Sequence, residues 1–246
     1  MRLKATIMGL LTRITPNTTD YSRKSMHARY ILCKITGPLL LGCLGAFAFG
    51  GQDRAAIRKQ LETVWVRARS GSELSKSDEG FLVRTINNPD PSQRVNSAFA
   101  GTILLYQAQA GKYPIKEAQE VLLTKVRHIK GRQCSTFAYM YWGTLANGLS
   151  VDRKVHSKWV ELDQQSQTNG FGSAERTFVN SLLKSHQKQD TVLIALVFLA
   201  KENLNRRDVG FMLDSTKEVT QSKLPIPVKT YWLSVQKILH QRFPLK

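Results

Sequence analysis

Apolar side chains recur every three or four residues from residue 53 to the end of the chain. This spacing places them on one face of an α-helix. One such stripe consists of Ile57, Leu61, Val64, Trp65 and Ala68. The same spacing, interrupted at glycines and prolines, predicts further helices over residues 73–87, 92–110, 115–130, 133–147, 151–162, 174–185, 190–202, 208–213 and 228–239. The pattern therefore predicts an all-α protein.

Two segments are apolar on all sides rather than along one stripe. Phe137–Trp142 is almost entirely aromatic or small, and Thr191–Ala200 reads TVLIALVFLA. The β-branched residues of Thr191–Ala200 also suit a strand. We predict a short helix at the centre of the core, because the chain offers no second strand to pair with it.

The helix expected from residue 92 has a clear start signal. Asp90 can cap the helix, Pro91 suits the first turn, and Gln93 can reach back to the cap amide.

The predicted helices form pairs, and the first helix of each pair begins near Ser92, Gln133 and Ala174, at intervals of 41 residues. A short echo accompanies the period: Ala98-Phe99-Ala100, Thr136-Phe137-Ala138 and Thr177-Phe178-Val179. A helix pair repeating about every 40 residues resembles HEAT or armadillo units. The resemblance implies a right-handed αα-superhelix of stacked hairpins over residues 52–246. An irregular helical bundle is the alternative.

Residues 1–51 read as a separate targeting segment. The uncharged run Ile35–Gln52 follows a basic stretch that includes Arg29 and Lys34. Its apolar part is short for a bilayer span, which takes about 20 residues. Ala46-Phe47-Ala48 fits a signal-peptidase site, with cleavage after Ala48. We therefore expect an exported or periplasmic protein.

Other readings of this segment stay open. Leu40-Leu41-Gly42-Cys43 resembles a lipobox, in which Cys43 would be lipidated. Residues 35–51 can also remain as a membrane anchor. Residues 1–34 are rich in Lys, Arg, Ser and Thr, with one acid, Asp20, which suits a mitochondrial transit peptide. Translation can start at Met1 or at Met26.

The chain carries a formal net charge of +18. Residues 1–51 contain seven Lys/Arg and one acid, so the helical part is basic by itself. Such a charge attracts nucleic acid, acidic lipid or other anionic polymers. No metal-binding HExxH or CxxC, no GxSxG and no phosphate loop occurs in the sequence. Cys134 is expected to be a small buried hydrophobe. We therefore predict no catalytic residue, metal or cofactor.

The candidate binding residues are cations. They form a predicted basic rim made of Lys125, Arg127, Lys130, Arg132, Lys154, Lys158, Arg206 and Arg207. The first four surround a helix C-terminus, where the helix dipole favours cations.

The function that these observations favour is that of a non-catalytic scaffold. It would bind a protein, an anionic polymer or a lipid surface through a basic or concave face. A nucleic-acid-binding repeat protein is the first alternative, although aromatic residues do not interleave with the basic runs. An enzyme whose site is assembled from distant residues is the second alternative. A small-molecule substrate is not expected.

Overall fold

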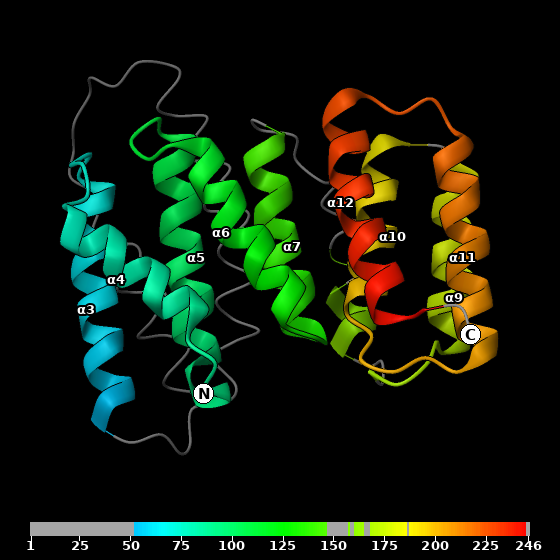
Figure 1. Ribbon diagram of the computed structural model, residues 1–246, viewed down its shortest axis with the longest axis horizontal. Coiled ribbons are helices and arrows are strands. Elements are labelled where there is room, and N and C mark those ends of the chain that lie inside the picture. Colours follow the sequence, from blue (N-terminus) through cyan, green and yellow to red (C-terminus); the bar gives the residue numbers. More distant parts are fainter. Residues whose placement is uncertain (1–51, 147–156, 158–159, 165–167, 186, 245–246) are drawn as a thin grey trace.

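A computed structural model of the protein describes residues 52–146, 157, 160–164, 168–185 and 187–244 (Figure 1). Within these ranges the chain is helical, and its β-structure is limited to a single bridge between Asn169 and Asn203. The prediction of an all-α protein is confirmed. The targeting segment with Cys43 and Ala48, and also Lys154 and Lys158, lie outside the described residues.

The described helices have the following bounds. They are α3 (Gln52–Arg69), α4 (Lys76–Asn87), the short 3₁₀ helix η2 (Pro91–Gln93), α5 (Arg94–Gln109), α6 (Ile115–His128), α7 (Arg132–Leu145), α9 (Ser173–Ser185), α10 (Lys188–Leu199), α11 (Arg206–Gln221) and α12 (Ile226–Arg242).

Local capping decides where several helices begin. Ser75 and Asp78 form a reciprocal capping box, so α4 begins at Lys76 rather than at Glu73. Asp90 caps η2 as predicted, and its carboxylate accepts from the Ser92 amide. The prediction that the Gln93 side chain accepts a hydrogen bond from the Asp90 amide is wrong. That amide donates to Asn88 Oδ1, and Gln93 accepts from Asn96 instead.

Helix α11 is longer than the short helix predicted over residues 208–213. The side chain of Asn205 accepts from the Asp208 amide and caps its start. Beyond residue 213, Thr216 and Val219 continue the buried stripe that begins at Met212. Burial of this stripe extends the helix to Gln221.

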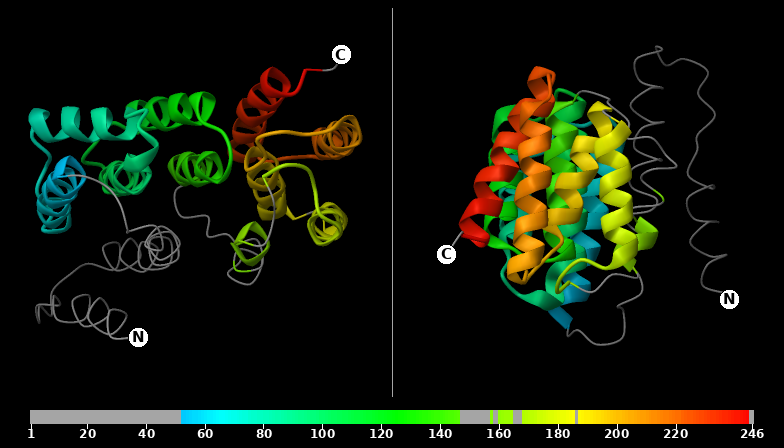
Figure 2. Two further views of the ribbon diagram at one scale, coloured as in Figure 1. Left: turned by 90° about the horizontal axis from the view of Figure 1, so that it is seen from below. Right: turned by 90° about the vertical axis from the view of Figure 1, so that its right-hand side faces the viewer.

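The helices form two rows, best seen end-on (Figure 2). Helices α3, α5, α7 and α10 follow one another in the first row, each packed on the next. Helices α4, α6 and α12 cover one side of this row. Helix α9 packs on α10 and on α11, beyond the end of the first row.

Helix α10 lies at the centre of the packing between α7, α9 and α12. Every residue from Asp190 to Ala200 is buried, so the prediction of a core helix here is confirmed. The ring of Phe198 meets Phe171 and Phe211 edge to face. The aromatic run on α7 is buried too, and Tyr141 and Trp142 both pack on Tyr231 of α12.

The 41-residue spacing holds for the helix starts but not for the packing. Phe99 and Phe137 are buried on α5 and α7, which are neighbours in the first row. Phe178 is only partly buried on α9. The next helix in the row after α7 is α10, because its whole circumference is apolar and has to be enclosed, whereas α9 has one apolar stripe.

No helix in the described ranges combines the length and the apolar character that crossing a bilayer requires.

A glycine allows α5 and α7 to approach closely. A Cβ built on Gly101 would lie 2.8 Å from the Met140 sulfur and 3.0 Å from a ring carbon of Phe137. Met140 and Phe137 are themselves buried and have little room to move.

We expect Gly101→Val to lower the free energy of unfolding by about 2 kcal/mol, because the added carbons overpack this contact. Urea denaturation measures the change. The control is Gly210→Ala on α11, where an added Cβ meets nothing within 4 Å. That variant should gain about 0.5–1 kcal/mol from helix propensity. Equal stability of Gly101→Val and the wild type would contradict the close packing of α5 on α7.

Candidate functional site

Cationic and amide side chains tie several helix ends together at one end of the two rows. We call this the cationic end: the region where α4, α6, α10 and α12 finish and α5, α7, α9 and α11 start. Asn96 on α5 donates to the Arg54 carbonyl of α3, and Lys125 Nζ donates to the Asn88 carbonyl after α4. Lys201, after α10, bonds Glu175 on α9. These bonds connect residues far apart in the sequence.

Arg242, in the last turn of α12, makes several of these connections. Its guanidinium donates to the carbonyls of Val126 and Ile129 at the end of α6 and to that of Leu199 at the end of α10. The last carbonyls of a helix have no partner within the helix, and they carry partial negative charge. One guanidinium therefore caps two helices and links them to a third.

Lys125 is not part of a surface rim, which corrects the prediction for this residue. Its side chain is buried, with Nζ 3.1 Å from the Asn88 carbonyl oxygen and 5.9 Å from the centre of the Phe137 ring. Burial lowers the pKa of its ammonium group below the usual value. Lys125 acts as an internal cap for the C-terminus of α4.

Two ion pairs join α9 to its neighbours. Lys201 lies 2.7 Å from both oxygens of the Glu175 carboxylate, and only 1% of the Lys201 side chain is exposed. Arg176 pairs with Asp208 on α11, and its guanidinium lies 4.8 Å from the centre of the Phe211 ring. Because both acids are buried, these cations keep two carboxylates in the interior compensated.

Arg132 starts α7 and lies 3.6 Å from the Asp163 carboxylate. Burial raises the pKa of the Asp163 carboxyl, and the charges of Arg132 and Lys201 oppose this rise. The Arg132 side chain is 43% exposed.

Four more of the predicted cations lie in described segments near the cationic end and are exposed. Arg127 and Lys130 flank the end of α6, and Arg206 and Arg207 occupy the first turn of α11. The α6–α7 connection contacts the α10–α11 connection. Gly131, at a positive φ of 71°, leaves room for the Glu202 carboxylate, and a Cβ at this position would overlap that carboxylate. The structure therefore brings the connection that holds Lys130 next to the connection that precedes Arg206 and Arg207, with the acid Glu202 between them. Arg127 lines a groove along α6 with Glu120 and Tyr141.

Cys134 is fully buried at the base of this region, as the sequence analysis expected. Its Sγ lies 3.5 Å from the Val126 carbonyl oxygen and 3.2 Å from the Arg242 guanidinium. Burial raises the pKa of the thiol, and Arg242 opposes this only in part. A buried, protonated thiol does not serve as a nucleophile.

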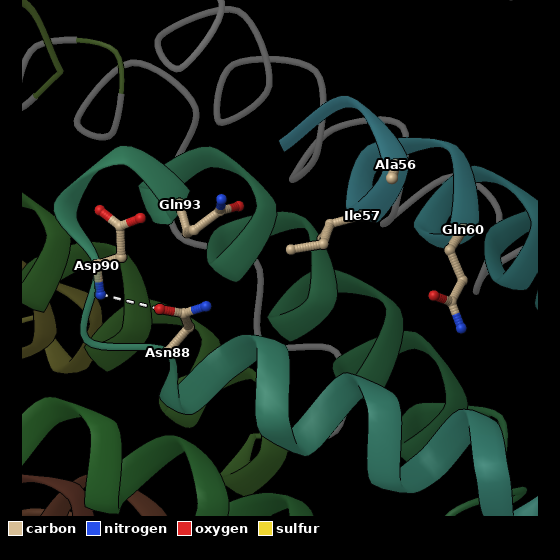
Figure 3. A pocket seen from close by; sticks show the side chains of 6 residues that line it. All are labelled: Ala56, Ile57, Gln60, Asn88, Asp90 and Gln93. Atoms are coloured by element: carbon tan, nitrogen blue, oxygen red, sulfur yellow. Dashed lines mark hydrogen bonds between the residues drawn. The ribbon is translucent and has the colours of Figure 1, made fainter. Parts of the chain in front are cut away.

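A cavity of about 430 Å³ lies between α3 and the α4–α5 connection. Figure 3 shows the side chains that line it: Ala56, Ile57, Gln60, Asn88, Asp90 and Gln93. Hydrogen bonds from Ser92 lower the pKa of the Asp90 carboxyl, so this carboxylate is ionised at neutral pH. Amides and one carboxylate can hydrogen-bond a ligand, but they include no nucleophile paired with a base.

In the described ranges, no three His, Cys, Asp or Glu side chains gather closely enough to hold a metal ion.

Comparisons with protein-family models, with curated proteins and with solved structures find no match for this chain. A functional assignment therefore depends on the geometry described above.

Sequence reasoning missed Arg242, Lys201 and the two buried acids Glu175 and Asp208. One signal was available for Lys201, which directly follows the apolar run of α10 and therefore had to be buried or to end the helix. No local signal identifies Arg242, because its partners lie more than 40 residues away.

We expect Lys201→Met to lower the free energy of unfolding by about 3–5 kcal/mol, because it leaves the Glu175 charge buried without its cation. The double variant Lys201→Met/Glu175→Leu should recover most of this loss, since it removes both charges. Urea denaturation of the two variants and the wild type measures the difference. A double variant as unstable as the single one would mean that Lys201 stabilises the fold by some other contact.

Proposed function

We propose that this protein is a non-catalytic helical scaffold that binds an anionic macromolecule through the exposed cations of its cationic end. The residues are Arg127, Lys130, Arg132, Arg206 and Arg207. The partner we favour is a protein with an acidic surface or an anionic polymer.

The observation that carries this proposal is the position of Arg206 and Arg207 at a helix N-terminus. They are the first two residues of α11, and both side chains are exposed. The helix dipole disfavours cations at this end of a helix. Helix stability therefore does not account for them, whereas it does account for Lys125 and Arg242, which cap helix C-termini.

The described cations differ in their exposure as well. Lys125 and Lys201 are buried, and each is engaged with an acceptor of the protein itself. Arg127, Lys130, Arg206 and Arg207 are exposed to solvent. Exposed charges of one sign raise association rates with an oppositely charged partner and favour it over others.

We further propose that the helix pairs belong to a right-handed αα-superhelix, and that residues 1–51 direct the chain out of the cytoplasm. The alternation of helices in two rows supports the first of these proposals. The basic and apolar pattern around residues 29–48 supports the second. Nucleic acid is the alternative partner, since it is also a polyanion.

Charge reversal at the cationic end tests the binding proposal. We expect Lys130→Glu/Arg206→Glu/Arg207→Glu to weaken binding to poly-L-glutamate by about tenfold or more at physiological salt, because repulsion replaces attraction. Fluorescence anisotropy of labelled polyglutamate measures the dissociation constant.

The matched control is Lys184→Glu/Lys217→Glu/Lys223→Glu, which makes the same change in net charge near the C-terminal ends of α9 and α11. This control should keep most of the affinity. An equal loss in both triple variants would show that net charge alone drives binding. Tighter binding of a DNA duplex, lost in the first triple variant only, would favour the nucleic-acid alternative.

The location proposal predicts the mass of the native chain. We expect protein purified from its own host to start at Phe49, because Ala46-Phe47-Ala48 fits a signal-peptidase site. Intact-mass spectrometry measures the N-terminus. A chain starting at an acylated Cys43 would indicate a lipoprotein instead, and a chain that retains residues 35–51 would contradict cleavage.

A further inference from the structure

The outward face of α12 combines exposed apolar side chains with cations. Within the described residues, three large apolar side chains are largely exposed: Ile226 at 82%, Val66 at 65% and Leu233 at 53%. Ile226 and Leu233 are seven residues apart on α12, which is about two turns, so they share one face. Lys229, Lys237 and His240 are exposed on the same face.

The charge of this helix has one sign only. Its sequence, IPVKTYWLSVQKILHQR, contains no acidic residue. Lys223 extends the basic character into the connection that precedes α12 and is exposed as well. A surface that complements this face therefore offers anionic groups to the lysines and an apolar layer to Ile226 and Leu233.

The opposite face of α12 holds the helix firmly in place. Tyr231 and Trp232 are buried, and Tyr231 packs against Tyr141 and Trp142 of α7. The main packing partners of α12 are α10 and α7, and Figure 2 shows its outward side at the margin of the molecule. Ile226 lies between Pro225 and Pro227, which restrict the backbone here. Its exposed side chain is therefore presented by a rigid segment, and contact costs little ordering of the backbone.

We infer that this face of α12 docks on an anionic lipid bilayer. Ile226 and Leu233 enter the interface between headgroups and acyl chains, and Lys229 and Lys237 bind the headgroup phosphates. Apolar side chains surrounded by lysines on the exposed side of a helix are the combination that binds peripheral proteins to acidic membranes.

The size of the patch favours lipid over a protein partner or a second copy of this chain. A stable protein interface takes about 20–30 residues on each side, with a well-packed apolar centre. The α12 face presents two apolar side chains and three basic ones. Peripheral membrane binding is instead a sum of small contributions, because each cation near an acidic surface and each buried apolar group adds to it.

Site-specific quenching tests the inference in the full chain. A tryptophan is introduced as Leu233→Trp, and Val66→Trp on α3 serves as the matched control, since both positions are exposed. The protein is mixed with vesicles of brominated phosphatidylcholine and phosphatidylglycerol at a molar ratio of about 7:3, a composition that supplies negative surface potential. Bromine on the acyl chains quenches only a tryptophan that reaches them.

We expect the Leu233→Trp fluorescence to fall in brominated vesicles relative to unbrominated ones, and the Val66→Trp fluorescence to remain unchanged. Both variants contain residues 1–51, so an anchor in that segment would bring both variants to the vesicles. Equal quenching at the two positions, or none at Leu233→Trp, overturns the inference. Concentration-dependent dimerisation blocked by Leu233→Trp without any quenching also overturns it, in favour of a second copy of the chain.

A second measurement uses flotation with the same lipids, unbrominated. Ile226→Ser/Leu233→Ser should lower the vesicle partition coefficient by about tenfold relative to Val66→Ser, because two apolar side chains no longer enter the bilayer. Equal flotation of the two variants overturns the inference. None of these substitutions touches the cationic end, so the outcome is separate from that of the proposed binding of an anionic macromolecule.

Discussion

The burial of α10 is the constraint on which the packing of this protein depends. A helix that is apolar around its whole circumference has to be enclosed on all sides. Helices α7, α9 and α12 supply that enclosure. This enclosure places α10 next to α7 in the first row. It also packs α12, the last described helix, against α10 and α7. For this reason α10 follows α3, α5 and α7 in the first row. Helix α9, which starts 41 residues after α7, does not.

The enclosure of α10 has an electrostatic consequence at the cationic end. Three helices that end close together, α6, α10 and α12, bring unsatisfied carbonyl groups into one region. Arg242 satisfies those of α6 and α10, and Lys125 does the same for the C-terminus of α4. The charges used for stability are thus inside, whereas Arg206 and Arg207 at the start of α11 are exposed to solvent.

Helix α12 connects the two proposed surfaces. Its inward side packs on α7 and α10, its last turn supplies Arg242 to the cationic end, and its outward side presents Ile226 and Leu233. A bilayer on the outward face and an anionic macromolecule at the cationic end would then contact different sides of the same rigid helix. Under these two proposals, binding to one surface would leave the other accessible.

The sequence alone determined the class of fold and most of its helices, because these depend on spacing along the chain. The 3.6-residue period identifies a helix whatever it packs against, the Asp90-Pro91 start acts locally, and TVLIALVFLA requires enclosure by itself. Only the tertiary structure decided which cations are exposed. Lys125 and Arg127 are two residues apart in one basic run, but one turns inward to the Asn88 carbonyl and the other faces solvent. The pairing of Arg242 with carbonyls from α6 and α10 was equally hidden, because the position of a helix end relative to a distant segment follows from packing of the whole core and not from any local pattern.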